Sequence, residues 1–222
     1  MCATVHFDPS QRWADLLQGG AVEAIAAFRS APAEHSPMGE FFICYHGYMD
    51  DTRNVTDEFK GLAHKEIVEA LDDRGVELEI AIENLERDFN MGTIVRSANA
   101  FGVRTVHVIG RKQWNKRGAM MTDKYLQVRY HQSIDAFVAA TAGRTLVAVD
   151  NVERSVPLAT SPLPRDALLL FGAEGPGISA ELLQKAATIV AIEQLGSTRS
   201  LNVGVAAGIA MYAWLQQQYL GS

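Results

Sequence analysis

Residues 167–178 read ALLLFGAEGPGI, an apolar run followed at once by a loop with three glycines. Five consecutive apolar residues without alternation predict a strand buried on both faces, as in a parallel sheet. The glycines let the backbone approach a ligand closely, and open parallel sheets bind ligands where their strands end. The spacing is not that of a dinucleotide fingerprint, and the Lys-Ser/Thr of a phosphate loop is missing. Taken alone, the loop is more simply explained as a tight turn.

Strands and helices alternate over the C-terminal two-thirds of the sequence. Apolar patterns predict strands at residues 78–82, 105–109, 145–149, 167–171 and 189–192, and helices at residues 91–101, 133–140, 179–187 and 202–219. This alternation is typical of an α/β fold with a mostly parallel sheet. Two further helices are predicted upstream, at residues 10–29 and 62–73. We therefore expect an acidic, mainly helical N-terminal extension at residues 1–76 and an α/β domain at residues 77–222.

The composition restricts the class of protein. The chain has 222 residues, 48% hydrophobic and 21% charged, which suits one core and excludes wholesale disorder. With two cysteines and no paired Cys/His spacing, we expect no disulfide scaffold, no metal and a reducing compartment. The first twenty residues lack an apolar run, and the longest apolar stretch, residues 204–215, is shorter than the ~20 residues of a membrane span. We expect a cytoplasmic protein without a signal peptide or a membrane partner.

Charge is distributed unevenly along the chain. The formal net charge is −6, yet residues 87–131 hold nine Lys or Arg and only two Asp or Glu. Within this basic segment four cations surround Trp114, an arrangement that can neutralise phosphates and stack a base. The residues that we predict to contact RNA are Arg104, Arg111, Lys112, Trp114, Lys116, Arg117, Lys124 and Arg129. On charge alone, a solvated loop explains the segment about equally well.

Two more loops combine glycine with polar residues next to a predicted strand. In the first, Asn90 precedes Gly92 and Arg96, which lie one helical turn apart. In the second, residues 192–203 read IEQLGSTRSLNV between the last strand and the last helix. Taken singly, each loop has a simple explanation: Asn90 and Asn202 as helix caps, and Arg96 as an ordinary surface arginine.

In this order and at these separations, the three loops resemble the signature motifs of the SpoU–TrmH family of RNA ribose 2'-O-methyltransferases, in the SPOUT superclass. The resembling segments are residues 90–103, 169–178 and 200–203, and the resemblance covers about residues 78–219. It implies an α/β fold with a deep C-terminal trefoil knot, and S-adenosylmethionine as the cofactor. It also implies a homodimer that acts on structured RNA, either tRNA or rRNA, and not on DNA.

The resemblance further implies roles for individual residues. The implied catalytic residues are Arg96, Asn90, Glu174, Ser200 and Asn202. The implied cofactor-binding residues are Gly172, Ala173, Glu174, Gly175, Gly177, Ile192, Gln194, Leu195, Gly196 and Leu201. Because a guanidinium ion is a poor base, we favour Arg96 as the group that binds the adjacent phosphate and stabilises the developing alkoxide. The chain departs from the family at residues 192–194, which read Ile-Glu-Gln where many members have Ile-Pro-Met.

Two other functions fit part of the sequence. A catalytically inactive RNA-binding or RNA-assembly factor could keep this fold, and failure to bind S-adenosylmethionine would favour it. A class I small-molecule methyltransferase is a third possibility, which failure to bind any RNA would favour. The glycine loop lies close to the C-terminal end of the sequence, which argues against this class. Residues 172–222 are too few to form one of the nucleotide-binding halves of such a fold. The sequence therefore favours the RNA methyltransferase.

Overall fold

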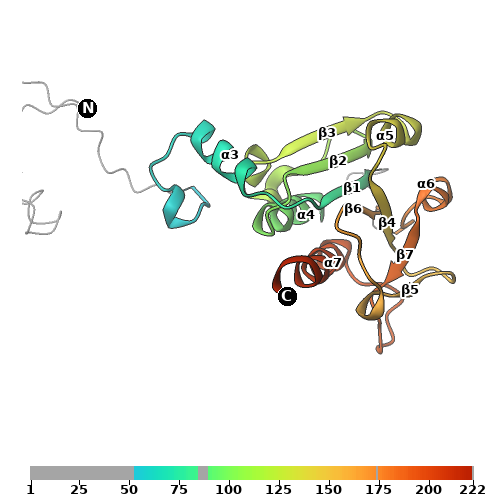
Figure 1. Ribbon diagram of the computed structural model, residues 1–222. Coiled ribbons are helices and arrows are strands. Elements are labelled where there is room, and N and C mark those ends of the chain that lie inside the picture. Colours follow the sequence, from blue (N-terminus) through green and yellow to red (C-terminus); the bar gives the residue numbers. More distant parts are fainter. Residues whose placement is uncertain (1–52, 85–89, 174, 222) are drawn as a thin grey trace, which may run out of the picture. The chain divides into compact units, whose positions relative to one another are not determined.

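The computed structural model describes residues 53–84, 90–173 and 175–221 (Figure 1). In this part of the chain the central feature is a seven-stranded sheet in the order β3-β2-β1-β6-β4-β7-β5. Its strands are β1 (Glu79–Asn84), β2 (Thr105–Gly110), β3 (Gln127–His131), β4 (Thr145–Val149), β5 (Val156–Pro157), β6 (Ala167–Phe171) and β7 (Thr188–Ala191). All neighbouring strands are parallel, so their carboxyl ends lie along one edge. The predicted parallel α/β sheet is confirmed.

Helices cover both faces of the sheet. α4 (Asn90–Ala100) and α7 (Val203–Leu215) pack on one face, and α5 (Ile134–Ala140) and α6 (Ala180–Lys185) pack on the other (Figure 1). Successive strand residues point to opposite faces. Accordingly Leu169 of β6 belongs to the core under α4 and α7, whereas Leu168 and Leu170 belong to the core under α5 and α6. Burial on both faces explains why the central strands read as unbroken apolar runs.

Most elements lie where the sequence predicts them. β4 and β6 have the predicted bounds, and β1, β7, α4, α5 and α6 begin and end within two residues of theirs. Ser133 and Ser179 cap α5 and α6, because each side-chain oxygen accepts a hydrogen bond from a backbone N–H of the first turn. The last helix is shorter than predicted: α7 ends at Leu215, and a π-helix follows at Gln216–Leu220.

Two strands were not predicted, β3 and β5. β3 has the sequence QVRYH and forms an edge of the sheet, where four of its five residues are partly or fully exposed. β5 has only two residues, both exposed. Neither strand carries the apolar signal on which the prediction of the other strands depends.

The N-terminal part of the described chain is tied to the α/β fold by α3 (His64–Asp73). Phe59 and Ile67 form a small apolar cluster with Tyr125, which precedes β3. Arg104, just before β2, binds Asp72 near the end of α3 with an Nε–Oδ1 distance of 2.8 Å. α3 therefore packs against the segments that flank the outer strands of the sheet.

The helix predicted at residues 10–29 lies outside the described residues. The predicted division of the chain between residues 76 and 77 stays a prediction. In the described ranges, no helix has both the length and the apolar character that crossing a membrane requires.

Candidate active site at the carboxyl edge of the sheet

The topology brings the three sequence motifs to the same edge of the sheet. β1, β6, β4 and β7 are neighbours in that order and run parallel. α4 begins after β1, the glycine loop at residues 172–178 leaves β6, and the loop at residues 192–202 leaves β7. The carboxyl edge of an open α/β sheet is where such folds bind ligands. This edge is therefore the candidate site.

The glycine loop folds tightly back on itself. The Gly177 backbone N–H donates to the carbonyl oxygen of Ala173 at 3.1 Å. Gly177 has a φ of 71°, and a Cβ on Gly172 would lie 2.0 Å from the carbonyl carbon of Gly177. Both positions require glycine, because a side chain would strain the first backbone conformation and clash in the second. Gly175 is exposed, and Glu174 lies outside the described residues.

Two carboxylates that the sequence reasoning missed support the end of this loop. Asp150, directly after β4, accepts the Ile178 backbone N–H at Oδ2, with an N–O distance of 2.9 Å. Glu83 of β1 accepts the Ser179 backbone N–H at Oε2, at 2.8 Å, and is only 3% exposed. The sequence gives one signal for Glu83: it is a charged residue directly after the apolar residues of a predicted strand. Together these bonds join β1 and β4 to the start of α6.

The first and third motifs meet through a pair of asparagines. Asn202 caps α7, because its Oδ1 accepts the backbone N–H groups of Gly204 and Val205 at 2.9 and 3.3 Å. Its Nδ2 also donates to Oδ1 of Asn90, at the start of α4, with a distance of 2.9 Å. The sequence predicts both caps separately; only the structure joins the two helix starts.

The loop after β7 is partly anchored and partly extended into solvent. Ile192 packs against the core under α4 and α7, whereas Leu195 is completely exposed. Gly196 and Ser200 are also exposed, and Leu201 is 36% exposed. These four predicted site residues are therefore accessible to solvent in the single chain.

The residues present fit S-adenosylmethionine, the cofactor that the resemblance implies. Its adenine amino group and ribose hydroxyls are hydrogen-bond donors. Gln194 Oε1 is a buried acceptor that has no hydrogen-bond partner within the described ranges. In the glycine loop, a Cβ on Gly175 would meet nothing within 4 Å, so the backbone there is open to a ligand. A buried acceptor without a protein partner suits a ligand that brings a donor.

Arg96 lines a cavity that does not include the described residues of the glycine loop. Its side chain is exposed on α4, and it forms no hydrogen bond or ion pair with any residue of the described segments. It lines a cavity together with Asn99 of α4 and residues of the N-terminal segment, and residues 172–177 are not among the lining residues.

One of the predicted RNA-contacting residues has a different place. Arg104 is 9% exposed and binds Asp72, and its Nη2 also donates to the Tyr125 carbonyl oxygen at 2.6 Å. Its guanidinium holds α3 against the sheet, and contact between Arg104 and RNA stays a prediction. Arg129 is exposed, but it is paired in register with His107, so it points to the sheet face that α5 covers.

Two of the other predicted cations lie beside aromatic rings. Trp114 Nε1 donates to the hydroxyl of Tyr130 at 3.3 Å. Lys112 Nζ lies 5.2 Å from the centre of the Tyr130 ring, and Lys116 Nζ lies 5.6 Å from that of Trp114. Lys116 also binds Asp123, with an Nζ–Oδ2 distance of 2.8 Å. Arg111, Lys112, Lys116, Arg117 and Lys124 are all exposed, so this surface presents cations beside aromatic rings.

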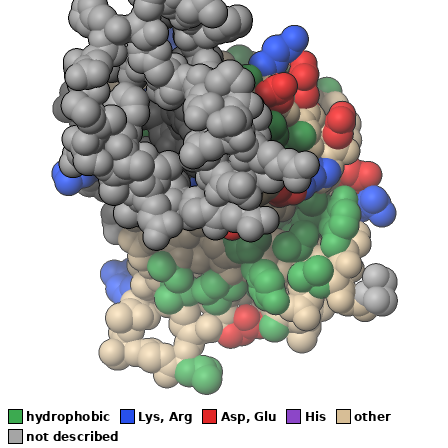
Figure 2. Space-filling view, turned by 90° about the vertical axis from the view of Figure 1, so that its left-hand side faces the viewer, with side chains coloured by type: hydrophobic (Ala, Val, Ile, Leu, Met, Phe, Trp, Pro, Cys, Tyr) green, Lys and Arg blue, Asp and Glu red, His purple; other side chains and the backbone are tan. Residues whose placement is uncertain are grey.

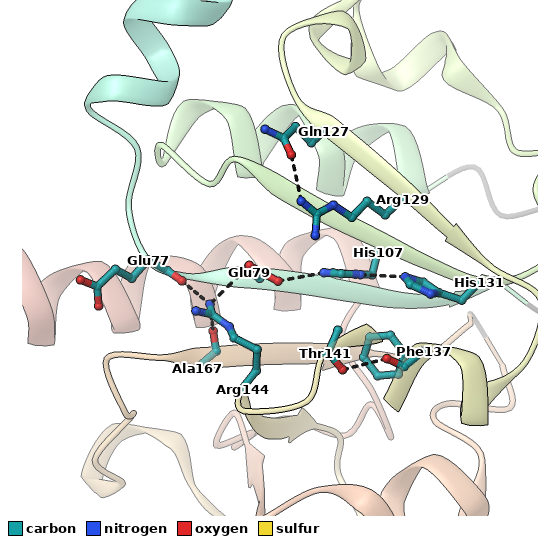
Figure 3. Close-up of polar contacts among 10 residues, drawn as sticks. All are labelled: Glu77, Glu79, His107, Gln127, Arg129, His131, Phe137, Thr141, Arg144 and Ala167. Carbon is teal, nitrogen blue, oxygen red and sulfur yellow. Dashed lines mark hydrogen bonds and ion pairs between the residues drawn. The ribbon is translucent and has the colours of Figure 1, made fainter. Parts of the chain in front are cut away.

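A buried polar network crosses the sheet face under α5 (Figure 3). Glu79 Oε2 lies 2.8 Å from His107 Nε2, and His107 Nδ1 lies 2.8 Å from His131 Nε2. An ionised Glu79 can only accept, so the Nε2–H of His107 donates to it. The Arg144 guanidinium lies 3.9 Å from the second Glu79 oxygen. Phe137 of α5 covers both imidazoles with edge-on contacts.

This network shifts the pKa of two of its members. Burial lowers the pKa of His131 below 6.5, its ordinary value, and the neighbouring His107 and Arg129 lower it further. Burial raises the pKa of Glu79, but the His107 hydrogen bond and the charge of Arg144 outweigh that effect, and the net direction is downward. Both shifts favour the ionised carboxylate and the neutral imidazole. Sequence reasoning missed the network, because it depends on strand register.

Comparison with known proteins gives consistent results. Residues 77–212 match the SpoU rRNA Methylase family. The chain is 30% identical over 161 residues, 70% of each chain, to the tRNA (guanosine(18)-2'-O)-methyltransferase of Escherichia coli strain K12. It is similar to the A. aeolicus TrmH/SpoU tRNA modifying enzyme, with a TM-score of 0.63, 25% identity and coverage of 71% of this chain and 83% of that one. It is also similar to the AdoMet-bound rRNA methyltransferase from Sinorhizobium meliloti, with a TM-score of 0.58, 25% identity and coverage of 67% and 60%.

Proposed function

The chain belongs to the SpoU rRNA methylase family, and from this premise we propose that it transfers a methyl group from S-adenosylmethionine to a ribose 2'-hydroxyl of structured RNA. The observation that carries the proposal is the meeting of the three motifs at one sheet edge, where Asn90 and Asn202 are hydrogen-bonded to each other. The relative from Escherichia coli is named as a tRNA methyltransferase. We therefore take tRNA as the first substrate to test and rRNA as the second.

We assign cofactor binding to the loops after β6 and β7. S-adenosylmethionine, when bound, supplies an electrophilic methyl group. Residues 172–177 offer backbone donors and acceptors, and the orphaned Gln194 Oε1 accepts an N–H or O–H of the cofactor. Leu195, Gly196 and Leu201, exposed in the single chain, supply the remaining contacts. Glu174 orients the glycine loop by accepting hydrogen bonds.

The chain's own residues then have to place and activate the ribose hydroxyl. A near-attack distance of about 3–3.5 Å between the reacting atoms is the main requirement of such a transfer. Arg96, exposed and unpaired among the described residues, binds the neighbouring phosphate and stabilises the negative charge that develops on the 2'-oxygen. The hydroxyl proton passes to that phosphate. Asn90 and Asn202 position the hydroxyl, and Ser200 orients the pocket.

We further propose that the chain acts as a homodimer in which α7 is covered by a second copy. α7 exposes Val205, Ile209 and Tyr212 at 53%, 40% and 48%, whereas Ala213 and Leu215 pack against the chain's own core. Hydrophobic side chains also gather on the side of the molecule that Figure 2 shows. The cavity that Arg96 lines does not include the glycine loop, and a second copy would supply a glycine loop next to Arg96.

The finer architecture of the resemblance is also part of the proposal. We infer that the segment from β6 to α7 is threaded as a trefoil knot. In the sheet, β4 lies between β6 and β7, although β6 and β7 follow each other along the chain. The chain therefore crosses β4 on its way from β6 to β7, and this crossing supports the inference. The acidic residues before residue 77 form a mainly helical extension, of which α3 is the described part.

Two measurements test the function together. Isothermal titration with S-adenosylmethionine should show binding, and the protein should then transfer a labelled methyl group to tRNA from cells that lack its gene. Mass spectrometry of the digested nucleosides should find the label on a ribose. Cofactor binding without transfer to tRNA or rRNA, or transfer to a base, would contradict the proposed reaction. Absence of cofactor binding would favour the inactive RNA-binding protein.

A further inference from the structure

A cavity of about 510 Å³ separates the N-terminal segment from α4. Its walls include Phe59, Ile67 and Leu71 on one side, and Arg96, Asn99 and Ala100 of α4 on the other. This volume lies within the range of ~300–1,000 Å³ that is common for small-ligand pockets. Arg96 borders this cavity, and the proposed reaction does not by itself explain what the cavity binds.

The N-terminal wall of the cavity is held in place by side chains of α3 and its neighbours. The Arg74 guanidinium binds Glu58 through two hydrogen bonds of 3.1 and 2.7 Å. The same group lies 4.6 Å from the centre of the Phe59 ring. Arg104 fixes the end of α3 through Asp72. These contacts connect the residues of the N-terminal wall to one another and to the segment before β2.

The polar groups that α4 contributes to the cavity lack partners among the described residues. Asn99 Oδ1 is buried and has no hydrogen-bond partner there. Arg96, three residues earlier on the same helix, is also unpaired within those residues and carries a positive charge. Residues three apart on a helix are surface neighbours. A ligand for this cavity should therefore offer an N–H donor to Asn99, a negative charge to Arg96, and a flat apolar surface to Phe59 and Tyr125.

A nucleotide has all three properties. We propose that this cavity receives the base of the target nucleotide, unstacked from the RNA, while Arg96 holds its phosphate and ribose. The inference rests on the proposed function and extends it, because it assigns substrate recognition to residues of the N-terminal segment and to Asn99. An unstacked base is commonly held against aromatic side chains and read along its hydrogen-bonding edge. Asn99 Oδ1 accepts an N–H from that edge.

Nuclear magnetic resonance of the full-length protein tests the site without requiring turnover. GMP, AMP, CMP and UMP are titrated separately into the ¹⁵N-labelled protein, with ribose 5-phosphate as the probe that lacks a base. The side-chain amide of Asn99 and the backbone amides of Ala100 and Thr122 should shift with at least one nucleotide. That nucleotide should bind roughly tenfold more tightly than ribose 5-phosphate, since stacking and one buried hydrogen bond are missing without the base.

Two variants and a matched control sharpen the test. Ala100→Phe fills the cavity from an exposed helix position, and Asn99→Ala removes the orphaned amide. Each should raise the KM for RNA about tenfold and leave the Kd for S-adenosylmethionine unchanged. Gln184→Ala, which removes an exposed amide from α6, should change neither value. The ¹⁵N spectrum of each variant shows whether it is folded.

Three results would overturn the inference. The first is that ribose 5-phosphate shifts the same amides and binds with the same affinity as the nucleotides. The second is that the Ala100→Phe variant binds nucleotides as tightly as the natural chain. The third is that S-adenosylmethionine shifts the amides of Asn99 and Ala100. Failure of the proposed function has a different signature. In that case RNA receives no ribose methyl group, whatever the nucleotide titrations show.

Discussion

At the scale of single residues, Arg96 is the side chain on which the proposed chemistry most depends. It is exposed, unpaired within the described residues and three residues from Asn99 on α4. Arg96→Lys keeps the positive charge but loses the planar, two-pronged donor set. We expect kcat for methyl transfer to fall roughly 100-fold or more, as when one charge-stabilising donor is removed. The Kd for S-adenosylmethionine should not change, and a variant with full activity would show that Arg96 is not the activating group.

Gly172 tests the geometry of the glycine loop. In Gly172→Ala the added Cβ would lie 2.0 Å from the backbone of Gly177, which cannot move aside as a flexible side chain can. We expect a loss of stability on the order of 1–3 kcal/mol, measured by urea unfolding, and weaker binding of S-adenosylmethionine. Gly208→Ala on α7 is the control, because nothing lies within 4 Å of its Cβ. Equal stability of the two variants would mean that the loop does not have this shape in solution.

At the scale of elements, the segment between β2 and β3 is a surface of cations and aromatic rings. Arg111, Lys112, Lys116 and Arg117 are exposed there, next to Trp114 and Tyr130. Replacing these four cations with alanine should weaken RNA binding and make it less dependent on salt. The slope of log binding constant against log salt concentration should become shallower by ~0.7–0.9 for each phosphate that the protein no longer neutralises. Lys185→Ala on α6 serves as the control. A salt slope that equals that of the natural chain would place the RNA on another surface.

The network across β1, β2 and β3 should make stability depend on pH. The pKa of His131 lies below its ordinary 6.5, so between these two values the unfolded chain binds a proton that the folded chain excludes. The free energy of unfolding should therefore be highest above pH 6.5 and decline as the pH falls below it. The lowered pKa of Glu79 acts in the same direction, below its ordinary 4.5.

His131→Gln isolates this effect, because the amide can still form a hydrogen bond with His107 but does not titrate. Urea unfolding between pH 5 and 8 should show a smaller decline below pH 6.5 than the natural chain shows. His64→Gln, at an exposed position of α3, should keep the natural decline. Equal pH profiles for all three proteins would exclude His131 as the titrating group.

At the scale of the whole molecule, α7 determines whether the chain acts alone. Its exposed Ile209 and Tyr212 would be covered in the proposed homodimer. Sedimentation equilibrium should give about twice the chain mass of 24.3 kDa for the natural protein, and the mass of one chain for Ile209→Arg. We expect Ile209→Arg to dissociate the dimer because burial of an unpaired charge in an apolar interface is unfavourable. A natural protein that sediments as one chain at micromolar concentration would contradict the dimer.

The sequence by itself determined five of the seven strands and the order of the motifs along the chain. Residues 145–149 and 167–171 were predicted with the observed bounds, because continuous apolar runs and glycine turns are local signals. Only the tertiary structure decided that Arg104 is buried against Asp72, that His107 meets His131, and that Arg96 borders a cavity formed with residues before β1. The first two of these contacts join residues that are 32 and 24 positions apart along the chain. They follow from strand register and helix packing, which no local pattern of side chains encodes.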